Sequence, residues 1–160
     1  MYYGLADDAI RRKIIMMLRE PQTCLSLTAQ QVATLYAHAQ AAQPAECCGL
    51  LGGTAGRVQS VYPLRNVARQ PLNEYDAAPE DLFGAQRLLR ERGEMLVGIY
   101  HSHPRQAVPQ PSLTDVRLAY YPSAVCFIIG LEGAAPVLRA FWLDAATESW
   151  ERARYIVVKG

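Results

Sequence analysis

Histidine and cysteine are both scarce, with three histidines and four cysteines among 160 residues. The cysteines form no C-x-x-C pair, and two of them, Cys47 and Cys48, are adjacent. This pattern argues against a secreted disulfide framework and favours free thiols in a reducing cytoplasm. We therefore expect a cytoplasmic protein.

Charge of one sign and long apolar runs are also lacking. The net charge is +1, and the longest basic run is Arg11–Lys13. A nucleic-acid-binding protein normally presents a basic face, so we expect no nucleic-acid partner. No apolar run approaches the roughly 20 residues of a membrane helix. Asp7 and Asp8 precede the basic triplet, so we expect neither a signal peptide nor a membrane partner.

The remaining composition is that of a globular protein, 51% hydrophobic and 19% charged, and the length predicts one domain. Apolar periodicity, caps and breakers predict a mixed α/β fold in which helices flank a central mixed sheet. The helices are expected at 6–20, 28–42, 79–92 and from about Ser112. The strands are expected at 46–53, 57–68, 94–103, 123–131, 136–144 and 151–158.

The most informative stretch is 101-HSHPRQAVPQPSLTD-115, which holds two of the three histidines. Side chains alternate along a strand, so His101 and His103 share one face at a spacing of about 6–7 Å. Asp115, in the first turn of the next helix, is the natural third ligand. Two histidines, one aspartate and a water form a hydrolytic zinc site. Taken alone, the S-x-x-D pattern from Ser112 is more typical of a helix cap, and the two roles are compatible.

The combined motif resembles the JAMM (MPN-plus) metalloprotease family. The H-S-H-P-x7-S-x-x-D signature of that family matches 101–115 at every defined position, and 44-PAECCGLLGG-53 resembles the upstream segment of bacterial members. The likeness extends from about Leu25 to the C-terminus, including 64-LRNVA-68 and 75-YDAAPEDLF-83. It implies a cytidine-deaminase-like JAMM/MPN domain at 23–160. Residues 1–22 lie outside the likeness, and their sequence pattern predicts a helical extension.

The resemblance also implies a chemistry. One zinc ion per chain would be held by His101, His103 and Asp115, with Glu46 as the catalytic base outside the ligand set and Ser112 donating to the oxyanion. The expected substrate is a ubiquitin-like sulfur-carrier protein of the ThiS or MoaD type with a Gly-Gly tail. The enzyme would cleave after the tail's last glycine and release an amino acid such as cysteine.

Two other functions stay open at this stage. One is a noncatalytic MPN scaffold, although a scaffold has no need of the complete residue set. The other is a RadC-like role near nucleic acid, for which the N-terminal segment is short. Three features receive structural interpretations: His38 lies within a helix, Cys47 and Cys48 are small side chains of a buried strand, and the apolar stripe of helix 6–20 packs on its own domain or on a second copy in a homodimer.

Overall fold

The computed structural model describes residues 24–54 and 56–160, so the helix expected at 6–20 and the extension at 1–22 lie outside the described residues. The elements are, in chain order, β1 (Leu25–Thr28), α2 (Ala29–Ala42), β2 (Cys48–Thr54), β3 (Arg57–Leu64), α3 (Pro79–Glu91), β4 (Met95–His103), α4 (Leu113–Arg117), β5 (Val125–Gly130), β6 (Val137–Asp144), β7 (Ser149–Arg152) and β8 (Tyr155–Val158).

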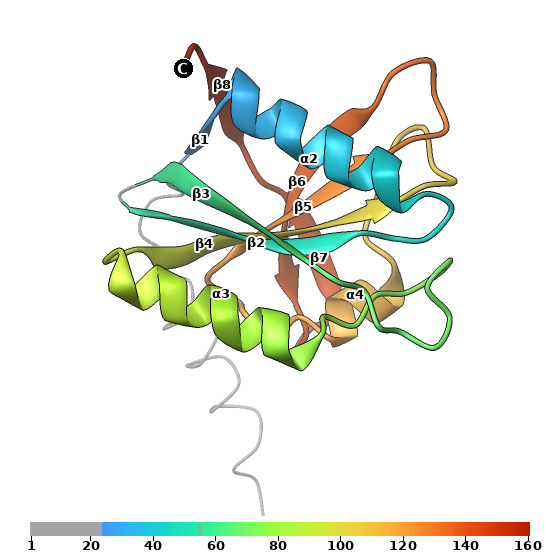
Figure 1. Cartoon of the computed structure of the whole chain (residues 1–160). Coiled ribbons are helices and arrows are strands. Elements are labelled where there is room, and N and C mark those ends of the chain that lie inside the picture. The colour runs from blue at the N-terminus through green and yellow to red at the C-terminus, as the bar shows by residue number, and fades with distance from the viewer. Residues whose placement is uncertain (1–23, 55) are drawn as a thin grey trace, which may run out of the picture.

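The strands form one mixed sheet in the order β7-β6-β5-β4-β2-β3-β1-β8. Strand β2 pairs antiparallel with both β3 and β4, whereas β4 and β5 are parallel. Helix α2 covers one face, and α3 and α4 lie on the other (Figure 1). The predicted α/β class with helices on a central mixed sheet is therefore confirmed. None of the described helices is long and apolar enough to span a membrane.

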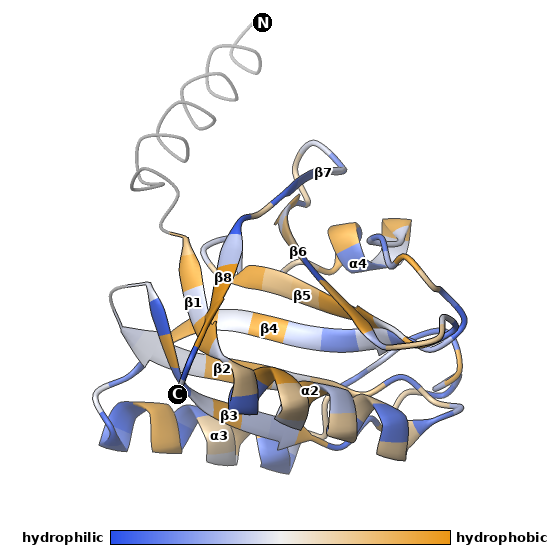
Figure 2. Ribbon diagram, turned by 90° about the horizontal axis from the view of Figure 1, so that it is seen from above, coloured by the Kyte–Doolittle hydropathy of each residue, from blue (hydrophilic) through white to orange (hydrophobic). Residues whose placement is uncertain are grey.

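Each face of the sheet has its own apolar core. Leu35 and Ala39 of α2 pack with Tyr100 and Phe127 on one face. On the other face, α3 packs over the β2–β3 hairpin, and Val116 of α4 packs against β5 and β6. Strand β5 is buried along its whole length and hydrophobic nearly throughout, as expected for a central strand next to a parallel neighbour (Figure 2).

Strand β4 distributes its last residues between these two faces. The fully buried ring of Tyr100 lies so close to Gly49 of β2 that a Cβ at position 49 would come within 2.4 Å of it. A glycine is therefore required opposite Tyr100. The tyrosine hydroxyl shares a hydrogen bond of 2.8 Å with Nδ1 of His38, which supports a structural role for that histidine.

Ser102, between the two histidines, joins β4 to the segment that precedes β2. Its buried Oγ accepts the N–H of Cys47 at 2.8 Å, and its own N–H donates to the Cys47 carbonyl at 3.2 Å. Glu46 therefore enters the sheet at a position fixed relative to the histidines. Nothing in the local sequence pattern predicts this role of Ser102.

The C-terminal prediction is wrong in one respect. The single strand expected at 151–158 is two strands, β7 and β8, at opposite edges of the sheet. Between them, Ala153 turns inward and its N–H donates to the carbonyl of Ala140 at 2.9 Å. The apolar pattern runs through this break, so it cannot show that the chain changes partner. The short strand β1 was also not expected, although the Thr28–Gln31 capping box that follows it is present.

Replacing Ser102 by alanine is expected to lower the free energy of unfolding by about 1–3 kcal/mol, because the buried N–H of Cys47 loses its acceptor. Urea unfolding monitored by circular dichroism measures this change. Ser123, an exposed turn residue, provides a control: Ser123→Ala is expected to change stability by less than about 0.5 kcal/mol. Equal effects of the two substitutions would contradict the proposed link between strands.

Candidate metal centre

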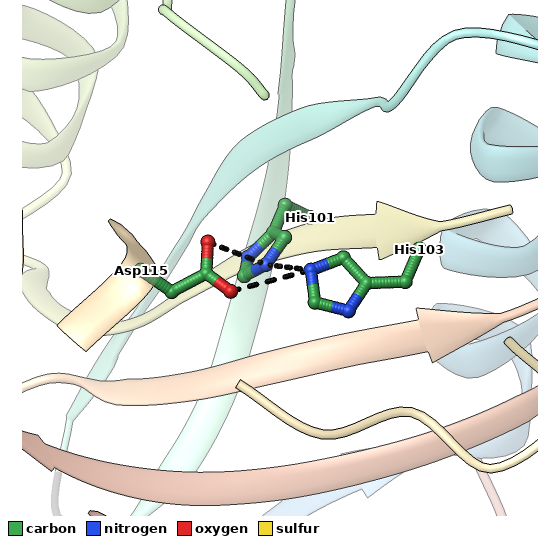
Figure 3. A group of neighbouring side chains, drawn as sticks. All are labelled: His101, His103 and Asp115. Atoms are coloured by element: carbon green, nitrogen blue, oxygen red, sulfur yellow. Dashed lines mark hydrogen bonds and ion pairs between the residues drawn. The ribbon is translucent and has the colours of Figure 1, made fainter. Parts of the chain in front are cut away.

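Three side chains from two elements converge at the end of β4. His101 and His103 point from β4 toward Asp115 of α4 (Figure 3). One donor atom from each lies within 4.8 Å of the others, so the group could hold a metal ion. The shared face predicted from strand alternation brings the histidines together, and the short helix returns the carboxylate to them.

The donor spacing fits a small tetrahedral ion. The two Nε2 atoms are 3.1 Å apart, and the Asp115 oxygens lie 3.3 Å from Nε2 of His101 and 3.2 Å from Nε2 of His103. Ligands at about 2.0–2.1 Å from a tetrahedral centre are roughly 3.3 Å apart. Each histidine faces a different Asp115 oxygen, and the residues present suit a small ion such as zinc. Protein ligands occupy three positions, which leaves a fourth for water or substrate.

Helix α4 is capped by one of the candidate ligands. Ser112 Oγ accepts the N–H of Asp115 at 3.1 Å, and Asp115 Oδ2 accepts the N–H of Ser112 at 2.7 Å. The capping interpretation and the ligand interpretation thus hold together, because Asp115 has oxygens enough for both. The cap restricts the rotamer of Asp115 in a helix of only five residues.

Burial and ion pairing shift the pKa values of the three side chains in different directions. Burial raises the pKa of Asp115, but the adjacent imidazoles outweigh it and hold that pKa well below its usual range. Burial lowers the pKa of His101 below its ordinary value despite the carboxylate. Burial also lowers the pKa of His103, but Asp115 more than offsets it, so the net shift is upward. A carboxylate in its charged form beside a neutral imidazole is the state that binds a metal.

Glu46 lies just outside this group. Its Oε1 is 4.0 Å from Nε2 of His103, and its Oε2 is buried without a hydrogen-bond partner among the described residues. The backbone is held by Asn66, whose amide donates to the Glu46 carbonyl, and by Pro71, whose carbonyl accepts the Glu46 N–H. Burial raises the pKa of Glu46 to about 7, with a smaller opposing effect of His103. Such a carboxyl can exchange a proton near neutral pH.

Tyr75 is a neighbour that the sequence analysis missed. Its ring stacks on His101 with a centroid distance of 4.7 Å and an interplanar angle of 29°. The other nitrogen of that imidazole, Nδ1, lies 3.9 Å from Sγ of Cys126. The His101 ring is therefore held on both sides. The 75-YDAAPEDLF-83 segment carried no periodicity that would have singled out the tyrosine.

The adjacent cysteines are unsuited to nucleophilic chemistry. Burial raises the pKa of Cys47 to about 11 and that of Cys48 to about 12, so both are thiols at neutral pH. A nucleophilic cysteine needs the thiolate. Their assignment as small buried side chains agrees with this.

A cavity of about 620 Å³ opens beside the metal group. It extends from Asp115 between the loop that contains Tyr75, the α3 helix and the segment after α4. Its lining includes Cys48, Leu64, Ile99, Tyr75, Tyr120 and Tyr121. An extended peptide segment can therefore approach the metal group over a largely apolar surface.

Comparison with known proteins agrees with this geometry. Residues 28–144 match the Prok-JAB model, described as prokaryotic homologs of the JAB domain. The chain belongs to this family. The predicted JAMM/MPN resemblance is thereby confirmed, and the match includes Glu46 and the whole 101–115 motif.

Several curated proteins are similar over most of their length. Desampylase of Haloferax volcanii is 36% identical over 115 residues, which is 68% of this chain and 82% of the relative. The CysO-cysteine peptidase of Mycobacterium bovis is 35% identical over 112 residues, 68% and 75% of the two chains. A probable TtuB-protein conjugate cleaving protease of Thermus thermophilus is 37% identical over 113 residues, 70% and 71%.

A solved structure extends the likeness to the fold. The solution structure of a Desulfitobacterium hafniense protein has a TM-score of 0.74 and 33% identity, covering 85% of this chain and 94% of that one. The family match and the named peptidase relatives support a hydrolase rather than a scaffold.

The buried carboxyl of Glu46 is expected to weaken the fold of the metal-free protein as the pH rises. Its folded pKa, about 7, lies above the ordinary value of 4.5, so the folded state binds the proton more tightly. Stability therefore falls between about pH 4.5 and 7. Glu46→Gln removes this loss, and its free energy of unfolding should exceed that of the wild type at pH 8 by roughly 2–3 kcal/mol more than at pH 4.

Urea unfolding in the presence of a chelator, at both pH values, measures the effect. Glu132 is an exposed acid, and Glu132→Gln is the matched control that should follow the wild-type curve. A Glu46→Gln curve parallel to that of the wild type would show that Glu46 is ordinarily hydrated.

Proposed function

We propose that this protein is a zinc-dependent peptidase that hydrolyses the bond after the C-terminal glycine of a ubiquitin-like sulfur-carrier protein. The amino acid released would be one such as cysteine. The observation that carries the proposal is the convergence of His101, His103 and Asp115, whose donor atoms lie within 4.8 Å of one another, with the carboxyl of Glu46 beside them. Together they provide a place for a metal and a proton acceptor within reach of it.

Zinc is the metal that this donor set favours, one ion per chain. Two imidazoles and one carboxylate are typical of catalytic zinc sites, which keep an open coordination position. When bound, zinc supplies a Lewis acid that lowers the pKa of water toward about 7 and polarises a carbonyl. The cap on Asp115, and the Tyr75 ring and Cys126 thiol against His101, hold these side chains in place before the ion binds.

Glu46 takes the role of proton carrier. Its carboxyl is too far from the three donors to be one of them but close enough to His103 to face the same space, and burial brings its pKa to about 7. It accepts a proton from the attacking water and returns it to the nitrogen of the leaving amine. A positioned carboxyl of this kind is typically worth a factor of about 10²–10⁴ in rate.

Ser112 takes the role of oxyanion donor. Its Oγ accepts the N–H of Asp115, so the hydroxyl hydrogen is left to donate elsewhere. The residue is exposed at the start of α4, beside the candidate ligands. A donor aimed at the developing oxyanion contributes about 3 kcal/mol to transition-state stabilisation.

The substrate class follows from the relatives and from the small size of the domain. The relatives are named for desampylation, for CysO-cysteine and for TtuB conjugates. Only 11 residues separate Asp115 from Phe127, which leaves no room for a large insertion that would shape a groove for ubiquitin. A narrow approach to the metal favours an extended tail of glycines, because any Cβ there would crowd the sheet edge.

The metal assignment predicts that the purified protein binds one zinc ion per chain and that the double variant His101→Ala/His103→Ala binds none. Loss of two of three ligands removes most of the affinity of such a site. Elemental analysis after equilibration with zinc and gel filtration measures the stoichiometry. His38→Ala, which removes the histidine outside the group, should keep full zinc content. Equal zinc in the double variant would show that the ion binds elsewhere.

The substrate assignment predicts cleavage of a ThiS-type carrier that ends in Gly-Gly followed by one added residue. The same carrier with Gly-Ala before the bond should be cut far more slowly, and linked ubiquitin chains should be poor substrates. Mass spectrometry of the carrier reports each cleavage. Glu46→Gln is the inactive control: it should retain zinc and lose at least about 10²-fold in rate. Efficient cleavage of ubiquitin chains without action on any carrier adduct would overturn the substrate assignment.

A further inference from the structure

Among the described residues, Arg105 forms no salt bridge with a carboxylate, and it lies close to the catalytic group. Its side chain is exposed, and its Nη2 donates to the carbonyl of Leu72 at 3.4 Å and to the side-chain oxygen of Asn73. Both acceptors are neutral. Within the described part of the chain, Nε and Nη1 have no hydrogen-bond partner. Two other exposed arginines are paired with acids: Arg65 with Glu80 and Asp81, and Arg117, the last residue of α4, with Glu148.

The contacts of Arg105 bring it near Glu46, close enough for its charge to act on that carboxyl. The loop that it contacts is the loop that holds Glu46, because the carbonyl of Pro71, the residue before Leu72, accepts the Glu46 N–H at 2.7 Å. Along the chain, Arg105 is two residues after His103, the histidine whose Nε2 lies 4.0 Å from the Glu46 carboxyl. Glu46 therefore lies between the loop that contains Pro71 and Leu72 and the end of β4, and Arg105 connects the two at the edge of this site.

The released amino acid is expected to lie at this edge of the site. Glu46 returns a proton to the leaving nitrogen, so that nitrogen comes within hydrogen-bond reach of the Glu46 carboxyl. In a single amino acid the α-carboxylate is two bonds away from the nitrogen. When the leaving group is a whole protein, the atoms at this distance from the nitrogen belong to a backbone amide or to the uncharged methylenes of a lysine side chain. A free carboxylate at this place would meet the unpaired donors of Arg105.

We propose that Arg105 binds the α-carboxylate of the amino acid that leaves the carrier tail, and so directs the enzyme toward adducts with one free C-terminal residue. The inference rests on the proposed function and names the leaving group that this site selects. Nη1, which the loop contacts leave free, can donate a charge-assisted hydrogen bond to one oxygen of that carboxylate. The contacts of Nη2 to the loop hold the side chain ready for it.

The test compares two substrates that differ only in this charge. A ThiS-type carrier ending in Gly-Gly-Ala is prepared with a free C-terminal carboxylate and with a C-terminal carboxamide, and kcat/KM for each is measured by mass with the zinc-loaded full-length protein. The wild type should prefer the acid by about 10- to 100-fold, as expected for a charge-assisted pair. Arg105→Gln should lose most of its activity on the acid and far less on the amide, bringing the ratio toward one.

Two control variants make the result specific. Arg90→Gln removes an exposed arginine of α3 that does not line the cavity, and should keep the wild-type ratio. Arg105→Lys keeps the positive charge and a donor, and should recover much of the preference. A wild-type ratio near one, or an equal loss on both substrates in Arg105→Gln, would overturn the inference and leave the peptidase intact. If the wild type cuts neither substrate, the proposed function itself fails and the inference with it.

Discussion

The last residues of β4 impose the constraint on which the rest of the site depends. Strand alternation puts His101 and His103 on one face and Ser102 on the other, so three consecutive residues serve the site from two sides. The histidines present two nitrogens 3.1 Å apart, and the serine fixes the segment that carries Glu46. The donor spacing and the position of the candidate base are thus set by the backbone of a single central strand. Side chains on flexible loops could not hold both to within a few tenths of an ångström.

Burial is what gives these groups their chemistry, and it has a cost. Glu46 is 5% exposed, its Oε2 lacks a partner among the described residues, and its pKa lies near 7. A glutamate in water has a much lower pKa, so its carboxylate is a weaker base at neutral pH. The same desolvation makes the ionised carboxylate unfavourable in the folded protein. The desolvated carboxyl thus lowers stability at neutral pH while giving Glu46 the pKa that the proposed proton carrier requires. The hydrogen bonds of Asn66 and Ser102 hold its segment in place.

The short helix α4 shows how little structure is needed to place the third donor. Its five residues are too few to be stable alone, but Ser112 and Asp115 cap one another across its first turn. Val116 anchors it in the core against β5 and β6. The cap fixes the Asp115 carboxylate on the side that faces the histidines, and the two imidazoles hold its pKa far below the usual range. Cap, ligand candidate and charge partner are one side chain.

The sequence by itself determined the parts that repeat locally. Alternation gave the shared face of His101 and His103, the S-x-x-D pattern gave the cap that returns Asp115, and turn and helix signals gave the α/β class. It could not give the contacts between segments far apart along the chain. Three contacts link such segments. Tyr75 stacks on His101, Ser102 accepts a hydrogen bond from Cys47, and Arg105 donates to the loop that holds Glu46. The separation of 151–158 into strands at opposite sheet edges is of the same kind. Local periodicity records only which face a residue takes, whereas the neighbour on that face is decided by how the whole sheet pairs and packs.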